Sequence, residues 1–525
     1  MPPWSPHPRP EPGRRQRTIQ RRPSMPTSSL KPLKQSEFDY WAAQHLLNRA
    51  GFGGTPDQVQ AVLQMGLDGA IEYLVEYEEA VRPLPLDVDQ FDSDIMRPAN
   101  NMERQLGLQA RRNGDERALE QLRQQRQQRQ RQDRRQIAQM QRWWLKRMIE
   151  TGRPLEEKMT LFWHGHFATG YRTIEDSWHM LQQNNLFRTH ATGNFADLVS
   201  WIIRDPAMLE YLDNNENRKG SPNENLAREL MELFCLGEGH DYTESDIKEA
   251  ARSLTGYTFD DDEFVFNSNQ HDDGMKRVLG KTGRFDGDDL LRIILGRTSC
   301  SEFICLKLYK FFVNDLPDGM DANTRKFIQR LAAEFRKNQY HLKPVLATLF
   351  KSEHFYDRAN RSALIKSPIQ LMVQTVRSLR TPSDRSMTAL VGAGDLMGQN
   401  LFQPPTVKGW DGGRAWINTS TLFVRQNIVI YLLTGQGPET MAWESDNIPY
   451  DPMHLLEHLD QDGNGTDRID AGVTYLLKFC LGTNPHPERV ESLTTFVRSN
   501  GNRLGPDQAI ACLCLIAAMP EYQLC

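Results

Sequence analysis

The chain has 525 residues, of which 39% are hydrophobic and 25% charged, and its 63 basic and 68 acidic side chains give a net charge of -5. This composition is typical of a soluble globular protein and excludes collagen-like, mucin-like and wholly disordered chains. The near-balanced charge gives no global field for DNA or RNA, so we predict no nucleic-acid partner. The longest apolar run, residues 509–519, is about half of the ~20 residues that a membrane span needs, so no transmembrane helix is expected.

The N-terminal segment, residues 1–35, is basic and rich in proline. It lacks the apolar stretch of a secretory signal, so we expect this segment to be disordered and the protein to be cytoplasmic on this sequence. Seven cysteines, odd in number and mostly in apolar contexts, indicate reduced, buried thiols rather than a disulfide framework.

Helix start and stop signals recur from residue 36 onwards. Residues 55–58 (TPDQ) offer a capping box with proline at the first helical position, and Gly66 predicts a break in the helix that follows. Similar starts stand at 221–224, 243–246 and 286–289. The agreement of caps, stop glycines and helical periodicity predicts a mainly α fold.

Strand patterns are rare. The best one predicts a short hairpin in which residues 257–259 pair with residues 263–266. We therefore expect a large multi-helical body with at most a short β-hairpin. It is divided into a helical domain at 36–435 and a C-terminal helical tail at 436–525.

Two polar segments stand out from the helical pattern. Residues 103–140 are rich in Gln and Arg and have almost no apolar stripe, which favours a solvent-exposed helix or disordered connector over a basic arm that binds phosphate or an acidic partner. Residues 460–470 resemble the first half of a calcium loop, but Ala471 stands where the bidentate carboxylate is needed. A polar turn is favoured there over a calcium site.

The densest cluster of chemically useful side chains contains His164 and His166. If the helix from Leu155 breaks near Gly165, residues two apart in extended backbone present both imidazoles to one metal ion, and His271 with Asp272 could complete the ligand set. The cofactor would then be a divalent metal. The alternative is a pair of histidines whose ring nitrogens are satisfied by backbone carbonyls in an aromatic corner.

A second cluster lies on a helix expected from Pro222 to about Leu236. Glu224, Arg228 and Glu232 line one face at i, i+4 and i+8, with Glu224 also placed for a capping box with Ser221. If the row is buried near the histidines, its residues are candidates for catalysis; if it is exposed, it is a set of ordinary helix ion pairs.

A third candidate follows a glycine-rich turn at residues 409–413. Trp410, Trp416, Asn418 and Arg425 offer the stacking and hydrogen-bonding groups that hold a sugar ring, which makes a carbohydrate a candidate partner. The alternative, a tryptophan-rich packing corner at the start of a helix, is the commoner use of such residues.

The motifs resemble those of a bacterial family. The pieces HLLNRAGFGGTP, LFWHGHF, ENLARELMELFCLG, HDDGMK and QNLFQPPTVKGWDGGRAWINTSTLFVRQN occur in the order found in the "domain of unknown function 1800" family. The resemblance covers about residues 40–435. It implies an uncharacterised protein that is exported or in the cell envelope, which makes an envelope protein a candidate partner.

Two functions follow as hypotheses. The first is a metal-dependent enzyme, a candidate hydrolase, that activates water against a polar or carbohydrate substrate. The second is a non-catalytic envelope scaffold or interaction protein, in which the same polar residues are buried structural networks.

Overall fold

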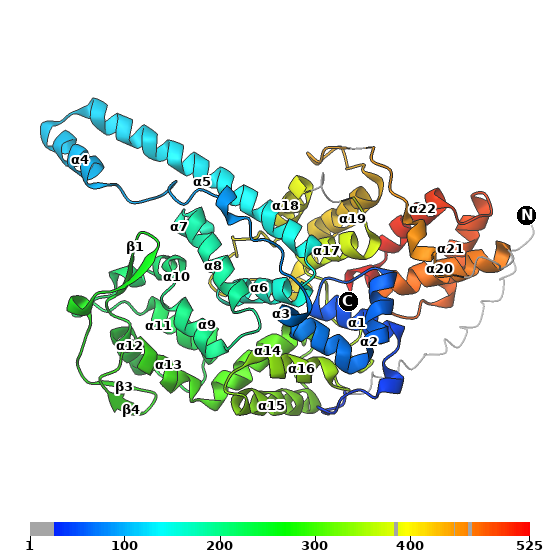
Figure 1. Ribbon diagram of the computed structural model, residues 1–525, viewed down its shortest axis with the longest axis horizontal. Helices are drawn as coiled ribbons and strands as arrows, with labels where there is room; N and C mark the ends of the chain where they lie inside the picture. The colour runs from blue at the N-terminus through cyan, green and yellow to red at the C-terminus, as the bar shows by residue number, and fades with distance from the viewer. Residues whose placement is uncertain (1–25, 383–386, 446, 460–464) are drawn as a thin grey trace, which may run out of the picture.

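The structure is a computed structural model that describes residues 26–382, 387–445, 447–459 and 465–525. Helices dominate it, which confirms the mainly α prediction (Figure 1). Strands in the described part of the chain form only two short two-stranded antiparallel sheets. No helix in this part has the length and apolar character that crossing a membrane requires.

The N-terminal helices begin as the caps predict. Thr55 and Gln58 form the capping box of α2, and the helix kinks at Gly66. Residues 26–35, which belong to the segment expected to be disordered, pack on the body: Leu33 is buried, its N–H donates to the carbonyl of Lys351, and the carbonyl of Lys31 accepts from the N–H of Glu353. Residues 1–25 lie outside the described part of the chain. The helices here are α1 (Tyr40–Ala50), α2 (Pro56–Val75) and α3 (Tyr77–Ala80).

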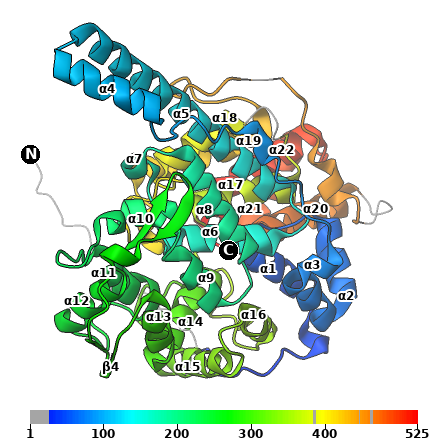
Figure 2. The same cartoon turned by 60° about the vertical axis from the view of Figure 1, so that its left-hand side comes forward.

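The Gln/Arg-rich segment is helical. It belongs to two antiparallel helices, α4 (Asn101–Asn113) and α5 (Glu116–Glu150), joined by a turn at Gly114. We call the part of this hairpin at residues 101–135 the arm, and it projects from the body in both views (Figures 1 and 2). Most of its side chains are exposed, and α5 returns to the core at Trp144, which is fully buried.

Helix α6 (Pro154–His166) lies in the middle of the body (Figure 1). Apolar residues stand on every face of it, and all its residues except Gly165 are buried. A helix of this kind must also bury its charged residues, which then need partners within the protein. The helices that follow α6 are α7 (Tyr171–Ile174), α8 (Ser177–Thr189), α9 (Phe195–Ile202) and α10 (Pro206–Tyr211).

The predicted hairpin forms as β1 (Tyr257–Asp260) and β2 (Glu263–Phe266), with Tyr257 paired to Phe266. A second hairpin, which the sequence analysis did not predict, pairs β3 (Lys276–Val278) with β4 (Lys281–Gly283). It packs on α12, where Asp246 and Glu249 accept from backbone N–H groups of the hairpin. The helices of this region are α11 (Asn225–Glu229), a π-helix η4 (Leu230–Cys235), α12 (Glu244–Ser253), α13 (Gly287–Leu295), α14 (Thr298–Phe312), α15 (Ala322–Lys337) and α16 (Leu342–Lys351).

The C-terminal helices pack back on the body. The hydroxyl groups of Tyr40 and Tyr475 are 2.9 Å apart, which joins α20 (Gly465–Leu481) to α1. Helix α22 (Pro506–Ala517) packs on α19 (Thr419–Thr434). The division of the chain at residue 435 stays a prediction. These helices are α17 (Pro368–Leu379), α18 (Met387–Leu396), α19 (Thr419–Thr434), α20 (Gly465–Leu481), α21 (Pro487–Ser499) and α22 (Pro506–Ala517).

Candidate functional site

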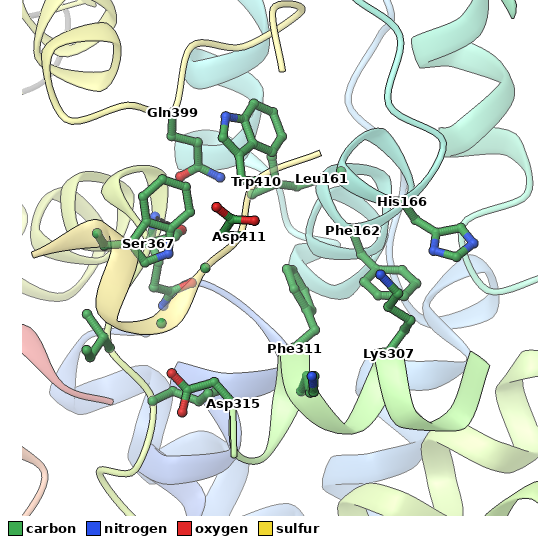
Figure 3. A pocket seen from close by; sticks show the side chains of 18 of the residues that line it. Leu161, Phe162, His166, Lys307, Phe311, Asp315, Ser367, Gln399, Trp410 and Asp411 are labelled. Atoms are coloured by element: carbon green, nitrogen blue, oxygen red, sulfur yellow. Dashed lines mark hydrogen bonds between the residues drawn. The ribbon is translucent and has the colours of Figure 1, made fainter. Parts of the chain in front are cut away.

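A pocket of about 510 Å³ lies where α6, α14, η4, the start of α17 and the loop at 409–416 meet. Figure 3 shows His166 and Lys307 on one side of Phe311, and Trp410, Asp411 and Asp315 on the other. The volume is within the range of small-molecule sites, and the lining combines aromatic rings with charged groups.

The 409–416 loop is fixed against α6 by a close backbone contact. Gly409 has φ +78°, and a Cβ there would lie 2.0 Å from the carbonyl oxygen of Gly165. Only glycine fits such a position, because both the left-handed backbone and the contact exclude a side chain. The contact carries Trp410 onto α6, where a Cβ on Gly165 would lie 3.5 Å from the indole ring.

Four buried polar atoms of pocket-lining residues have no hydrogen-bond partner in the described part of the chain: Nε of Arg49, Nδ1 of His166, Nε1 of Trp410 and Oδ1 of Asp315. Buried polar groups are nearly always hydrogen-bonded, to protein, water or ligand. One acceptor, two N–H donors and a carboxylate oxygen therefore have no partner around one cavity. Burial also raises the pKa of Asp315 above its ordinary value.

The pocket also holds several cationic side chains. Of its lysines, Lys408 pairs with Glu238 at 2.5 Å, whereas Lys158, Lys307, Lys310 and Lys366 form no ion pair with any described residue. Burial lowers the pKa of Lys158 to about 7 and that of Lys366 to about 8. An anionic group in the pocket would meet amines that form no ion pair with described residues.

His164 and His166 are not brought to one point. Helix α6 continues through Gly165 to His166, so the expected break there is wrong, and residues two apart on a helix face different sides. His164 Nε2 accepts from the N–H of Phe402 at 3.0 Å, whereas His166 Nε2 donates to the carbonyl of Phe234 in η4 at 3.0 Å. Burial lowers the pKa of each imidazole to about 3.

The other two residues of the predicted metal set lie beside the hairpins. His271 Nδ1 donates to the carbonyl of Thr255 at 2.8 Å, and Asp272 forms a bidentate pair with Arg252 at 2.7 and 3.1 Å. Neither residue lines the pocket. Across the described residues, no three His, Cys, Asp or Glu side chains are grouped as metal ligands, so the expected convergence of the four does not occur.

The row of Glu224, Arg228 and Glu232 forms, but as a network of ion pairs. Arg228 contacts both glutamates of the row and also binds Glu244 through two bonds of 2.9 and 2.8 Å. Only Glu232 lines the pocket. The predicted capping box with Ser221 does not form, since the chain turns at 218–221 and Glu224 becomes the residue before α11 without capping it.

Only two of the four residues of the predicted carbohydrate site line the pocket. Trp410 and Trp416 line the pocket, whereas Asn418 caps α19 by accepting from the N–H of Thr421. Arg425 is fully buried and does not line the pocket; its guanidinium donates to Gln523 and to the carbonyl of Lys366.

Of the calcium-like segment, residues 460–464 lie outside the described part, and Asp470 pairs with Arg498 at 3.1 Å.

Our sequence reasoning missed Lys158, Lys307, Lys366 and Asp315. One signal was present: residues 154–166 have apolar side chains on every helical face, so Lys158 had to be buried with the rest. The other three come from segments without a motif, and only the tertiary fold brings them to the cavity.

A family model described as "Protein of unknown function (DUF1800)" matches residues 45–524, nearly the whole chain. The match includes residues 436–524, which lie beyond the motifs that carried the resemblance. Comparisons with curated proteins and with solved structures gave no match.

Proposed function

Because the chain belongs to the DUF1800 family of proteins of unknown function, which assigns no reaction, we propose from the pocket itself that the protein binds a small polyhydroxylated compound with an anionic group, such as an acidic sugar. One observation carries this proposal: buried polar atoms of His166, Trp410 and Asp315 are unsatisfied around one cavity. A ligand with several hydroxyl groups supplies both donors and acceptors to such atoms.

The aromatic lining supports a ring-shaped ligand. Indole rings of Trp410 and Trp416 offer flat apolar surface together with N–H donors, a combination suited to the C–H face and the hydroxyl edge of a sugar. The amines of Lys307 and Lys310, which form no ion pair with described residues, support an anionic substituent.

The proposal includes an enzymatic role. Asp315 is the candidate general acid or base, because its half-buried carboxyl has a raised pKa and a free oxygen in the pocket. Since His164, His166, His271 and Asp272 lie apart, hydrolysis at this site would not use them as one metal set.

Isothermal titration with glucuronate and with glucose tests the binding proposal. We expect glucuronate to bind at least about tenfold more tightly, since only it carries a negative charge. Trp410→Ala should abolish most of this binding. Trp201→Ala, which removes an exposed indole from α9, should leave it unchanged. Equal affinity for the two sugars, or an unaffected Trp410 variant, would contradict the proposal.

The arm favours a second function, docking of a partner protein. Met102, Leu106 and Leu108 are 72%, 54% and 56% exposed on α4, so three large apolar side chains of one helix are left uncovered in the described structure. Chemical cross-linking with mass spectrometry in the native host would place partners on the arm, and a Met102→Ser, Leu106→Ser, Leu108→Ser variant should lose those cross-links. Cross-links that survive the triple variant would contradict this role.

A further inference from the structure

The buried charges of α6 are not all compensated. Glu157 is fully buried and pairs with Arg147 at 3.1 Å and with Arg188 at 2.7 Å. Glu156 pairs with Arg153 at 3.5 Å. The next residue, Lys158, is also buried, but its amine has no carboxylate partner in the described part of the chain. A buried amine without an ion-pair partner is costly and therefore needs another reason to be there.

The surroundings of Lys158 are apolar and aromatic. Its Nζ lies 4.9 Å from the centroid of the Phe52 ring and 5.4 Å from that of Phe311. Its hydrogen-bond partner is the side-chain carbonyl of Gln370, whose amide group in turn donates to Asn48 and Gln374. This neutral partner orients the amine without adding a negative charge.

This environment favours the neutral amine. Burial is the largest cause of the lowered pKa of Lys158, the positive charge of Arg49 on α1 acts in the same direction, and Cys525 acts against it. Near neutral pH a substantial fraction of Lys158 therefore carries a free lone pair, whereas an exposed lysine is almost wholly protonated.

We propose that Lys158 is a nucleophilic amine that forms an imine with the carbonyl group of an anionic aldehyde or ketone bound in the pocket. The geometry that carries this is a buried amine on the wall of an open cavity, oriented by a neutral amide and held between two rings. The inference rests on the proposed function only in placing the ligand in the same pocket.

The step balances without an oxidant or reductant. The lone pair of Nζ attacks the carbonyl carbon, the C–N bond forms, and the C=O π electrons move to oxygen, which takes up the proton that the nitrogen loses. The hydroxyl then takes up a proton and leaves as water while the nitrogen lone pair forms the C=N bond. The nitrogen releases its remaining proton, which balances the proton taken up by the hydroxyl. Amine and carbonyl compound thus give imine and water, and Asp315 is a pocket group able to hold the proton that the leaving hydroxyl takes up.

The other pocket lysines suit this role less well. Lys366 donates to the backbone carbonyl of Tyr522, which cannot rotate away as an amide side chain can. Lys408 is paired with Glu238, and Lys310 is exposed to solvent. Lys307 lies 5.3 Å from the ring of Phe303 and is only half-buried.

Glyoxylate with sodium cyanoborohydride at pH 7 tests the proposal, because the reductant converts an imine into a stable carboxymethyl amine. Peptide mass spectrometry should locate the first carboxymethyl group on Lys158, formed at least about tenfold faster than on exposed lysines. Lys158→Met should remove this fast phase, and Lys281→Met, at an exposed site on β4, should retain it. Labelling of Lys158 no faster than that of exposed lysines would overturn the proposal.

A pH series on the unaltered chain keeps the test decisive if the methionine variant does not fold. Labelling of Lys158 should reach half its maximal rate near pH 7, whereas a midpoint above about pH 9, as for exposed lysines, would overturn the proposal. Glucuronate binding without fast labelling would reject the imine and leave the proposed function standing. Fast labelling without glucuronate binding would support the imine and reject the acidic sugar.

Discussion

His164 on α6 accepts a hydrogen bond from the backbone N–H of Phe402, with 3.0 Å between Nε2 and N. The ring is packed among Trp144, Phe402 and Trp410, with centroid distances of 5.3, 5.7 and 5.5 Å. The bond therefore joins the central helix to the segment that leads into the pocket loop. It requires a neutral imidazole, because a protonated ring has no lone pair to accept with.

Stability should consequently fall in mild acid. The folded-state pKa values of His164 and His166 are about 3, below the ~6.5 of an unfolded histidine. Between these values the unfolded chain binds more protons, so stability is complete above about pH 6.5, declines as the pH falls, and the loss is full below about pH 3. From pH 7 to pH 5 we expect a loss of about 2 kcal/mol per histidine in urea denaturation. His164→Gln, which keeps an acceptor but does not titrate, should show a shallower slope; identical slopes would contradict the assignment.

The buried ion pair on α6 gives a second prediction. Glu157 accepts from Arg147, Arg188 and the indole N–H of Trp144, so Glu157→Gln would leave two guanidinium groups together without a countercharge. We expect a loss of about 3 to 5 kcal/mol in the free energy of unfolding. Glu37→Gln, at an exposed pair with Lys34, should change it by less than about 0.5 kcal/mol. A Glu157 variant as stable as the Glu37 variant would show that the pair contributes little.

Local signals in the sequence predicted the helical framework well. The capping box of Thr55 and Gln58 and the kink at Gly66 formed as expected, because both depend on residues within one or two turns of the chain. The end of α6 was misjudged, since a glycine near a helix end does not by itself stop the helix. The indole ring of Trp410 packs on Gly165, and this contact could not be predicted because Trp410 lies far along the chain.

The chemistry of the pocket could not be predicted in the same way. Glu157 and Lys158 are neighbours and both are buried, yet Glu157 pairs with Arg188 whereas Lys158 donates to Gln370, far away in sequence. Nothing local distinguishes the two. Trp410 and Trp416 were identified because aromatic residues in a glycine-rich turn form a compact motif, whereas Asp315 belongs to no recognisable motif.

The contact between Gly409 and Gly165 predicts unequal effects for two similar substitutions. Gly409→Ala should cost at least about 2 kcal/mol and weaken glucuronate binding, because its Cβ would meet the Gly165 carbonyl at 2.0 Å in a left-handed backbone. Gly165→Ala should stay within about 1 kcal/mol of the parent, since its Cβ would lie 3.5 Å from the Trp410 ring, an ordinary contact, in a helix that favours alanine. Thermal unfolding and titration of both variants measure this, and equal losses would show that the loop is not anchored here.

The arm should be the first described segment that trypsin cuts, and the turn between its two helices is the expected position. Gly114 ends α4 with φ +63°, and Arg111, Arg112 and Arg117 on either side of it are exposed. A helix end frays locally at little cost in free energy, whereas the regular interior of α5 must unfold before a protease can bind it. Brief digestion followed by mass spectrometry should therefore give cuts between residues 111 and 117, and Arg111→Gln, Arg112→Gln, Arg117→Gln together should delay them. Early cleavage inside the helical body, with the turn intact, would mean that the arm is covered in solution.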